Sequence, residues 1–233
     1  MGKRKKKNYW VVKQCGITLI ELLIALTIFG FVIGGSYRVF VAQSKAYTVQ
    51  DQVVEVQQNI RSAMEVLLRD LRMAGFDDDG PNSKVTVPTP TLLIGDDSIT
   101  VFYEYDNTTR YTVSYVRDAL NSWVTRQLTI TKDDGSIVAG PQEIILENVD
   151  SLTFTYGVDG NNDRAMDDRN KNGVIDENDW VSAATVTAEG ANVVAVRVVL
   201  TAKAEQVNPD LKTVNPRSLI SAVTLRNLCM NIK

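Results

Sequence analysis

The chain has 233 residues, which is enough for one folded domain with a sizeable core and an appended segment. It contains no histidine, so a Ser-His-Asp triad and a histidine-ligated zinc site are both excluded. The net charge is −3, but six of the 25 basic residues precede Gly16, which leaves 19 basic against 28 acidic residues in the rest of the chain. This acidic balance argues against a nucleic-acid partner, and we expect neither catalysis nor a small-molecule substrate.

Residues 17–36 form a hydrophobic segment in which Glu21 is the one charged residue. About 20 apolar residues span a bilayer as a helix, so the segment predicts a transmembrane helix. The basic residues lie before it and keep the N-terminus cytoplasmic. We therefore expect a single pass through a membrane, with the bulk of the chain on the far side.

Other interpretations of this segment are a secretory signal peptide, a lipoprotein signal and a plain signal anchor. A signal peptide would be cut on the far side of the apolar run, near Gly34 to Ser36. A lipoprotein signal has its apolar run before the cysteine, whereas Lys13 and Gln14 precede Cys15. A plain anchor leaves Glu21 unexplained, because a charge at the centre of a membrane helix costs roughly 2.5 to 3.5 kcal/mol.

The six residues from Gly16 to Glu21 read GITLIE, which closely resembles the prepilin motif of type IV pilins and type II secretion pseudopilins. The resemblance implies that residues 1–16 are a leader peptide, that a prepilin peptidase cuts after Gly16, and that it methylates the new amine of Ile17. It also implies that Glu21 pairs with the N-terminal amine of a neighbouring subunit. A carboxylate that is costly alone in a membrane becomes acceptable beside a positive amine, so it can select correctly placed neighbours.

Residues 37–75 predict an amphipathic continuation, giving one helix from about residue 17 to residue 74, which Gly75 ends. Between the apolar positions lie polar residues, Asp70 among them. A cluster of Gly30, Gly34 and Gly35 predicts either local melting of the helix or close packing of helices in the membrane. The apolar stripe is made by residues at steps of three and four: Val53, Val56, Ile60, Met64, Leu67, Leu71 and Ala74.

The run from Tyr47 to Gly75 is similar to PilW-type minor pilins, in which a Gln-rich helix ends in an Arg-Asp-Leu-Arg-x-Ala-Gly pattern, here residues 69–75. The resemblance covers roughly the first third of the chain, and the remainder matches only in general character. It implies a subunit that initiates or supports pilus assembly, joins other pilins in the filament, and moves from the inner membrane to the cell surface. The alternatives are a type II secretion pseudopilin and a membrane-anchored periplasmic binding or adhesion domain that never polymerises.

Some members of that family carry a cysteine soon after the glycine, but here Phe76 and three aspartates follow. A disulfide-pinned head loop is therefore not expected. After a cut behind Gly16 the mature chain keeps Cys229 alone, and we expect this thiol to be buried in the apolar stretch 225–230.

Residues 76–233 predict a β-rich head. A long helix followed by a series of strands indicates an α+β fold, in which a mainly antiparallel sheet packs on the amphipathic helix. Hairpin turns are expected at Asp106-Asn107 and at Asp133 to Gly135. Alternating, β-branched segments predict strands at 84–88, 91–94, 98–105, 109–116, 122–131, 143–147, 151–157, 184–188, 192–203 and 218–226.

An acidic loop, 159–179, carries the one motif with a defined chemistry. Residues 168–179 fit the EF-hand calcium template, with Gly173 at the turn position and Asp179 in place of the final glutamate. We expect a structural Ca²⁺ site of weak affinity, about 0.1 to 1 mM, that orders the loop. The oxygens of Asp159, Asn161 and Asp163 offer a second ion site. The predicted calcium ligands are Asp168, Asn170, Asn172, the carbonyl of Val174, Asp176 and Asp179.

Overall fold

The computed structural model describes residues 16–77, 83–204 and 215–230, without the side chains of residues 229 and 230. Residues 1–15 of the leader and the side chain of Cys229 lie outside the described part, so the predictions made for them stay predictions. The chain divides into two compact units, residues 1–48 and residues 49–233.

The helix α1 spans Leu19–Met73, which confirms the predicted helix to within two residues at either end. In the first unit its residues are exposed except for the half-buried Val41, and the helix runs on through Gly30, Gly34 and Gly35. An 18-residue window near its start is apolar enough to cross a membrane, and none of that window is buried. A helix that is apolar all round and has no core of its own to cover matches a membrane or filament segment.

In the second unit α1 buries one face in the head. The buried positions Val56, Ile60, Met64, Leu67 and Leu71 recur at helical spacing, as the predicted stripe requires. The opposite face carries Gln57, Arg61, Glu65 and other exposed polar residues. The head is therefore built around the last five turns or so of the helix.

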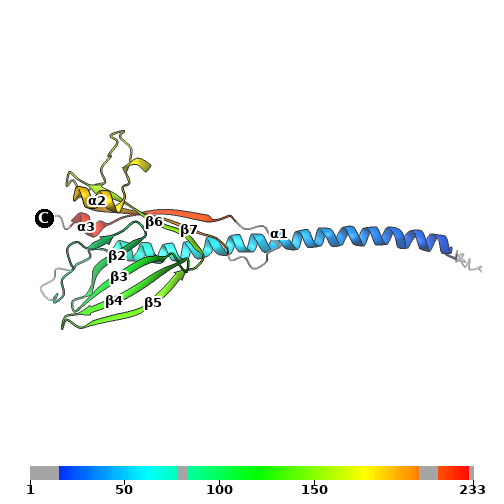
Figure 1. The fold of residues 1–233 in the computed structure, drawn as a ribbon, viewed down its shortest axis with the longest axis horizontal. Coiled ribbons are helices and arrows are strands. Elements are labelled where there is room, and N and C mark those ends of the chain that lie inside the picture. The colour runs from blue at the N-terminus through cyan, green and yellow to red at the C-terminus, as the bar shows by residue number, and fades with distance from the viewer. Residues whose placement is uncertain (1–15, 78–82, 205–214, 231–233) are drawn as a thin grey trace, which may run out of the picture. The chain divides into compact units, whose positions relative to one another are not determined.

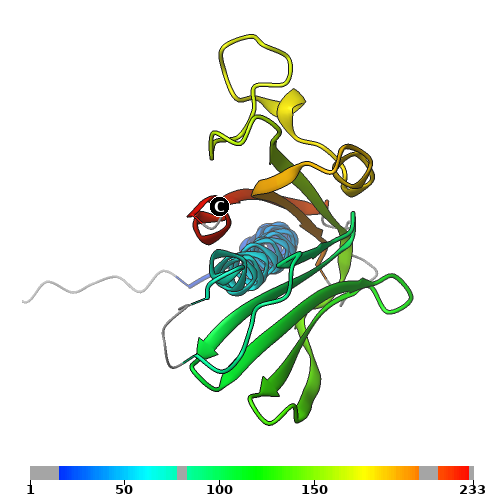
Figure 2. The same cartoon turned by 90° about the vertical axis from the view of Figure 1, so that its left-hand side faces the viewer.

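Two antiparallel sheets lie on two sides of this helix segment (Figures 1 and 2). The larger sheet has the order β1-β2-β3-β4-β5 and the smaller one β6-β7-β8. Every pairing is between antiparallel strands, as predicted for the head. The strands are β1 (Leu92–Ile94), β2 (Ser98–Asp106), β3 (Thr109–Asp118), β4 (Trp123–Lys132), β5 (Ile137–Leu146), β6 (Val149–Asp159), β7 (Asn192–Ala202) and β8 (Arg217–Thr224).

The core lies between the helix and the inner faces of both sheets (Figure 2). Along β2 and over most of β7, alternate residues point inward, as the two-residue period of a strand dictates. The larger sheet contributes buried Val101, Val113 and Val124, and the smaller one contributes Phe154 and Val198. A single cluster of buried side chains joins α1 to both sheets.

Two predicted strands are wrong. Residues 84–88 have no regular structure, and residues 184–188 belong to a short helix, α2 (Ala183–Glu189). The hydroxyl of Ser182 accepts a hydrogen bond from the Thr185 amide at the start of α2, and Gly190 ends it in a left-handed conformation. These caps outweigh the strand preference of the β-branched residues between them.

The end of α1 is closed by a helix from the other end of the sequence, α3 (Arg226–Met230). Gly75 adopts φ +70°, and its amide donates to the carbonyl of Phe102 at 2.9 Å. The side-chain amide of Asn227 donates to the carbonyls of Arg72 and Ala74 at 3.2 and 3.3 Å. The two bonds from Asn227 satisfy carbonyls at the end of the helix, which lack an intrahelical partner.

Candidate functional site: the assembly segment and the head loop

The three residues Gly16, Ile17 and Thr18 precede α1 without regular structure. A side chain placed on Gly16 would meet no atom within 4 Å, and Ile17 is 75% exposed. The peptide bond after Gly16 is therefore open to a processing enzyme.

Thr18 caps the start of α1. Its hydroxyl accepts a hydrogen bond from the Glu21 amide at 3.3 Å, and its carbonyl accepts one from the Leu22 amide at 3.2 Å. A threonine followed three residues later by glutamate is the sequence pattern of a helix N-cap, a signal that was present but not used in the sequence analysis. Glu21 is thereby fixed in the first turn, where the helix dipole favours a negative charge.

Among the described residues, no basic side chain lies within ion-pair distance of Glu21. Its neighbours along the helix are exposed apolar residues such as Leu22 and Ile24. The described chain thus brings together the predicted processing residues and the predicted assembly carboxylate within six positions, without pairing that carboxylate internally.

A buried ion pair attaches α1 to the larger sheet through Asp70, one of the polar residues between the apolar positions of the helix. Asp70 is 3% exposed, and its Oδ2 accepts hydrogen bonds from Nε of Arg126 at 2.9 Å and from the hydroxyl of Tyr115 at 2.6 Å. Burial, reinforced by the Asp70 carboxylate, raises the pKa of Tyr115, so the hydroxyl remains a donor. Asp70 is buried because two strand residues satisfy its charge.

In the acidic loop, residues 159–179, the structure gathers four of the predicted calcium ligands around one turn. Oδ1 of Asp168 accepts from the amide of Asn172 at 3.2 Å, and Oδ1 of Asn170 accepts from the same amide at 3.0 Å. The side-chain amides of Asn170 and Asn172 donate to Asp176 at 3.2 and 2.8 Å. The amide of Asn178, with help from Asn172, holds the pKa of Asp176 below its usual value.

Asp179 takes a different position. It is fully buried, and its two carboxylate oxygens accept hydrogen bonds from the amides of Arg169 at 2.8 Å and of Asp176 at 2.7 Å. It therefore ties the two ends of the loop together. In the described ranges, no three His, Cys, Asp or Glu side chains approach closely enough to hold a metal by themselves, since two of the four gathered residues are asparagines.

The same turn occurs twice, nine residues apart, which the sequence analysis did not recognise. Asp159 accepts from the amides of Asp163 and Arg164 at 3.2 and 2.8 Å, as Asp168 does from the residues four and five positions after it. The backbone has positive φ at Asn162 and Arg164 in the first turn and at the corresponding Lys171 and Gly173 in the second. The repeat was hidden because Arg164 stands where the second turn has glycine.

Contacts on both sides fasten this loop to the smaller sheet. Arg169 makes a two-pronged ion pair with Glu189 of α2, at 2.8 and 2.7 Å. Arg197 of β7 lies 5.2 Å from the ring centroid of Trp180 and 3.1 Å from Glu177. These contacts attach the loop to α2 and to β7.

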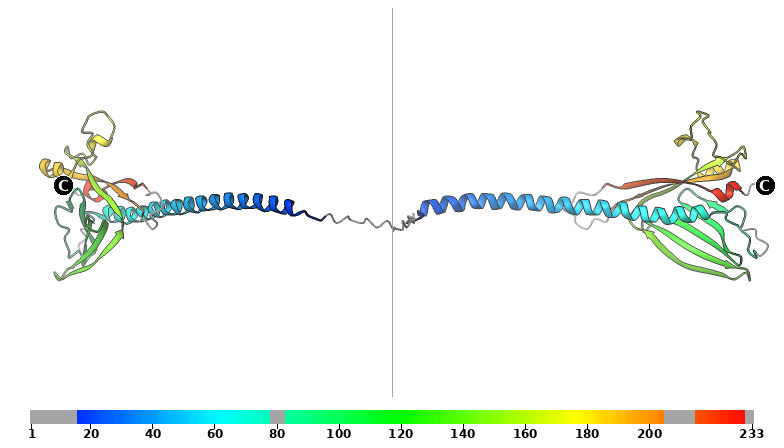
Figure 3. Two further views of the ribbon diagram at one scale, coloured as in Figure 1. Left: turned by 45° about the vertical axis from the view of Figure 1, so that its right-hand side comes forward. Right: turned by 180° about the vertical axis from the view of Figure 1, so that it is seen from behind.

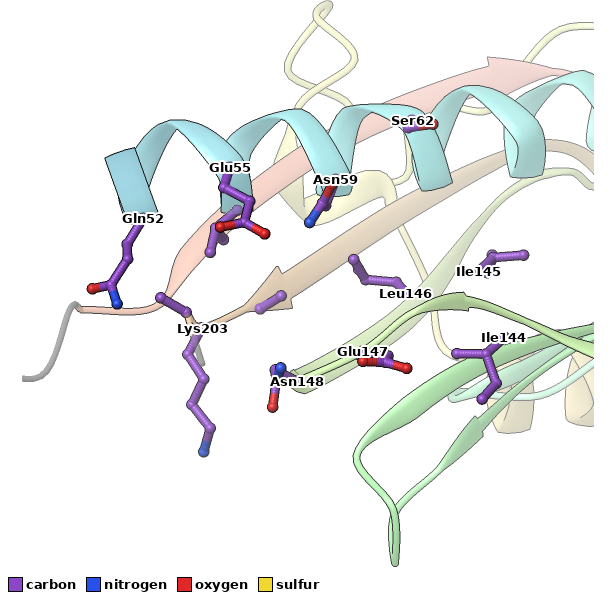
Figure 4. A pocket seen from close by; sticks show the side chains of 13 residues that line it. Gln52, Glu55, Asn59, Ser62, Ile144, Ile145, Leu146, Glu147, Asn148 and Lys203 are labelled. Carbon is purple, nitrogen blue, oxygen red and sulfur yellow. The ribbon is translucent and has the colours of Figure 1, made fainter. Parts of the chain in front are cut away.

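A cavity of about 440 Å³ opens between α1 and the ends of β5 and β7 (Figure 4). Glu55 of the helix and Glu147 of the β5–β6 connection line it, as does Lys203 at the end of β7. All three are exposed and their charges are mixed, and none of the predicted site residues reaches it. The cavity therefore does not add to the candidate site.

Comparison with known proteins gives two matches to family models. The family described as Type IV Pilus-assembly protein W matches residues 95–227, more than half of the chain and most of the head. The prokaryotic N-terminal methylation motif matches residues 12–37. No curated protein and no solved structure matches the chain.

Proposed function

Because the chain belongs to the type IV pilus-assembly protein W family, we propose that it is a minor pilin that initiates or supports pilus assembly and enters the filament. The observation that carries this proposal is the joint match of both ends: a methylation motif at the start and a head of the pilus-assembly family. A type IV pilus, rather than a secretion pseudopilus or a solitary anchored domain, fits both matches.

The mechanism follows from the helix. The prepilin peptidase removes the leader at the exposed bond after Gly16 and leaves Ile17 as the methylated N-terminus. The apolar half of α1 holds the subunit in the inner membrane until it leaves for the filament, where other pilins replace the lipid around it. No reaction at the head is part of this function.

Mass spectrometry of the chain from purified filaments tests this proposal. The expected mature protein begins at Ile17 and carries one methyl group on its amine. A mature protein that begins at Met1 or Tyr37 would exclude processing as a prepilin. Absence of the chain from filaments would exclude incorporation.

Glu21 is proposed to pair with the N-terminal amine of a neighbouring subunit. Glu21→Ala is expected to leave the amount of membrane-bound chain unchanged and to lower the filament-bound amount roughly tenfold, the effect of losing one hydrogen bond to a charged group. Immunoblots of membrane and sheared-filament fractions measure both amounts.

The matched control is Glu21→Gln, which keeps the shape of the side chain and removes its charge. It should behave like the alanine variant if charge pairing is what matters. Normal filament incorporation of both variants would refute the pairing role.

The acidic loop is proposed to bind one structural Ca²⁺. Calcium takes about six to eight oxygen ligands, and the side chains of Asp168, Asn170, Asn172 and Asp176, already held around one turn, can supply part of that set. Bound calcium would neutralise the carboxylates and hold the loop ordered outside the cell.

Calorimetric titration of the mature chain in detergent tests this site. We expect heat of binding at millimolar calcium and, at about ten times Kd, a stabilisation of about 1.4 kcal/mol. Asp168→Asn should abolish the heat. The control Asp134→Asn makes the same charge change in the β4–β5 turn and should leave the heat of calcium binding unchanged. If the wild-type chain gives no heat with calcium, the proposed calcium site is wrong.

A further inference from the structure

The two sheets have four outer edges, and three of them are blocked or blunted. The β1 edge is only three residues long. The β5 strand contains Pro141, which lacks an amide donor, and its pairing with β4 shifts register twice. Natural proteins blunt exposed edges in such ways because a free edge recruits other strands.

The β6 edge is covered by the chain itself. The amide of Phe154 donates to the carbonyl of Asp96 at 2.8 Å. Tyr156 and Val181 exchange two backbone hydrogen bonds at 2.8 and 2.9 Å. Further along, the amide of Asp167 donates to the carbonyl of Val158 at 2.9 Å.

Among the residues that the structure describes, the β8 edge has none of these protections. Its eight residues pair with β7 in unbroken register, and within the described residues no other strand pairs with them. There is no proline within the strand, and from Ser218 to Thr224 there is no charged residue. Figures 1 and 3 show β8 as the outer strand of the smaller sheet.

The free hydrogen-bonding groups on this edge can be identified. The amide of Leu225 donates to the carbonyl of Val194 at 2.8 Å, and in an antiparallel pair successive residues alternate between facing the partner and facing away. The backbone groups of Ser218, Ile220 and Ala222 therefore point away from β7.

We propose that β8 accepts an extended strand from a neighbouring pilin subunit, which joins the smaller sheet as a fourth strand; this inference rests on the proposed function. A row of alternating amides and carbonyls is complemented by another strand, and strand addition to a sheet edge is a recurrent mode of recognition. Since Ser218 to Thr224 carry no charge, the incoming strand is uncharged along most of its length, with an acidic residue favoured opposite Arg217.

The direction of the chain argues against two copies of β8 pairing in the symmetric antiparallel way. Figures 1 and 3 show β8 running along the part of α1 that lies in the head. A two-fold axis that makes two β8 strands antiparallel would also point the two helices in opposite directions. Chains anchored in one membrane share a direction, so this antiparallel pairing of two β8 strands is disfavoured.

Hydrogen exchange resolved to single amides tests the proposal on the full mature chain, in detergent and in purified filaments. The amides of Ser218, Ile220 and Ala222 are expected to exchange at least about tenfold more slowly in filaments, as amides do when they gain a hydrogen bond. The amides of Leu219 and Ser221 face β7 and serve as the internal reference. The β5 edge, residues 137–146, is the control edge and should not change.

A pair of variants at one position provides the second measurement. Ile220→Pro removes the outward amide and keeps the ladder to β7, and it is expected to lower the filament-bound amount about tenfold, by the loss of about one hydrogen bond. Ile220→Val keeps the amide and a similar side chain, and should be incorporated like the wild type. Thermal unfolding in detergent verifies that both variants are folded.

The possible outcomes separate a failure of the proposed function from a failure of the β8 inference. If the wild-type chain is absent from filaments, the proposed function fails and this inference fails with it. If the chain is present but its outward β8 amides exchange as fast as in detergent, only this inference is overturned. A β8-dependent dimer in detergent would assign the edge to a second copy and would also overturn it.

Discussion

Replacing Asp70 by alanine is expected to destabilise the head by about 3 to 5 kcal/mol, the usual cost of removing one partner of a buried ion pair. The substitution removes the buried carboxylate from the guanidinium of Arg126, whose side chain is only 14% exposed, and leaves it only the more distant and more exposed carboxylate of Glu143 at 3.6 Å. It also removes the acceptor of the Tyr115 hydroxyl. Chemical unfolding of the mature chain in detergent, followed by the fluorescence of Trp123 and Trp180, measures the loss.

Two control variants separate the buried pair from ordinary surface charge. Arg69 lies 3.5 Å from the same carboxylate, but its side chain is 67% exposed, so Arg69→Ala should cost no more than about 1 kcal/mol. Replacing Asp70 and Arg126 together by leucine and methionine should be far milder than removing Asp70 alone, because no unpaired charge remains buried. A loss below about 1 kcal/mol for Asp70→Ala would contradict the central role of this pair.

Gly75→Ala is expected to cost about 2 to 4 kcal/mol, from the left-handed backbone and from overpacking together. Gly75 has φ +70°, a conformation that disfavours a side chain, and an added methyl group would clash with the side chain of Leu228. The same fluorescence measurement of unfolding applies.

The chain contains a matched control for this effect. Gly135 has φ +82°, but no atom lies within 4 Å of where its side chain would be. Gly135→Ala therefore carries the backbone term alone, about 1 to 2 kcal/mol. If the two variants are equally mild, the packing of Leu228 on the end of α1 does not contribute to stability.

The sequence allowed the long helix to be predicted nearly to the residue, because its apolar pattern is long and strongly periodic. The strands from β2 to β4 were also predicted well, since alternation and hairpin turns are local signals. The division into two sheets could not be predicted, because nothing local distinguishes strands of one sheet from those of the other. The helix α2 could have been predicted from its two capping residues, Ser182 and Gly190, but the β-branched residues between them favoured a strand.

Asp70 shows why part of the site was missed. On the helix it looks like an exposed polar residue, and its burial depends on Arg126, 56 positions later. No periodicity within one element reveals such a partner. The family match also lies elsewhere than expected: the resemblance visible in the sequence covers the first third of the chain, whereas the family match covers residues 95–227. The head therefore resembles the family over most of its length, although its short strands contain no motif that is recognisable by eye.

The closure of α1 by α3 has a consequence for the order of synthesis. The amide of Asn227 that caps Arg72 comes from a residue 155 positions later in the chain. When the ribosome has completed the helix and most of the head, the end of that helix still lacks its cap. Asn227 thus completes the end of a helix translated far earlier, and a chain that stopped before this residue would leave the carbonyls of Arg72 and Ala74 without this donor.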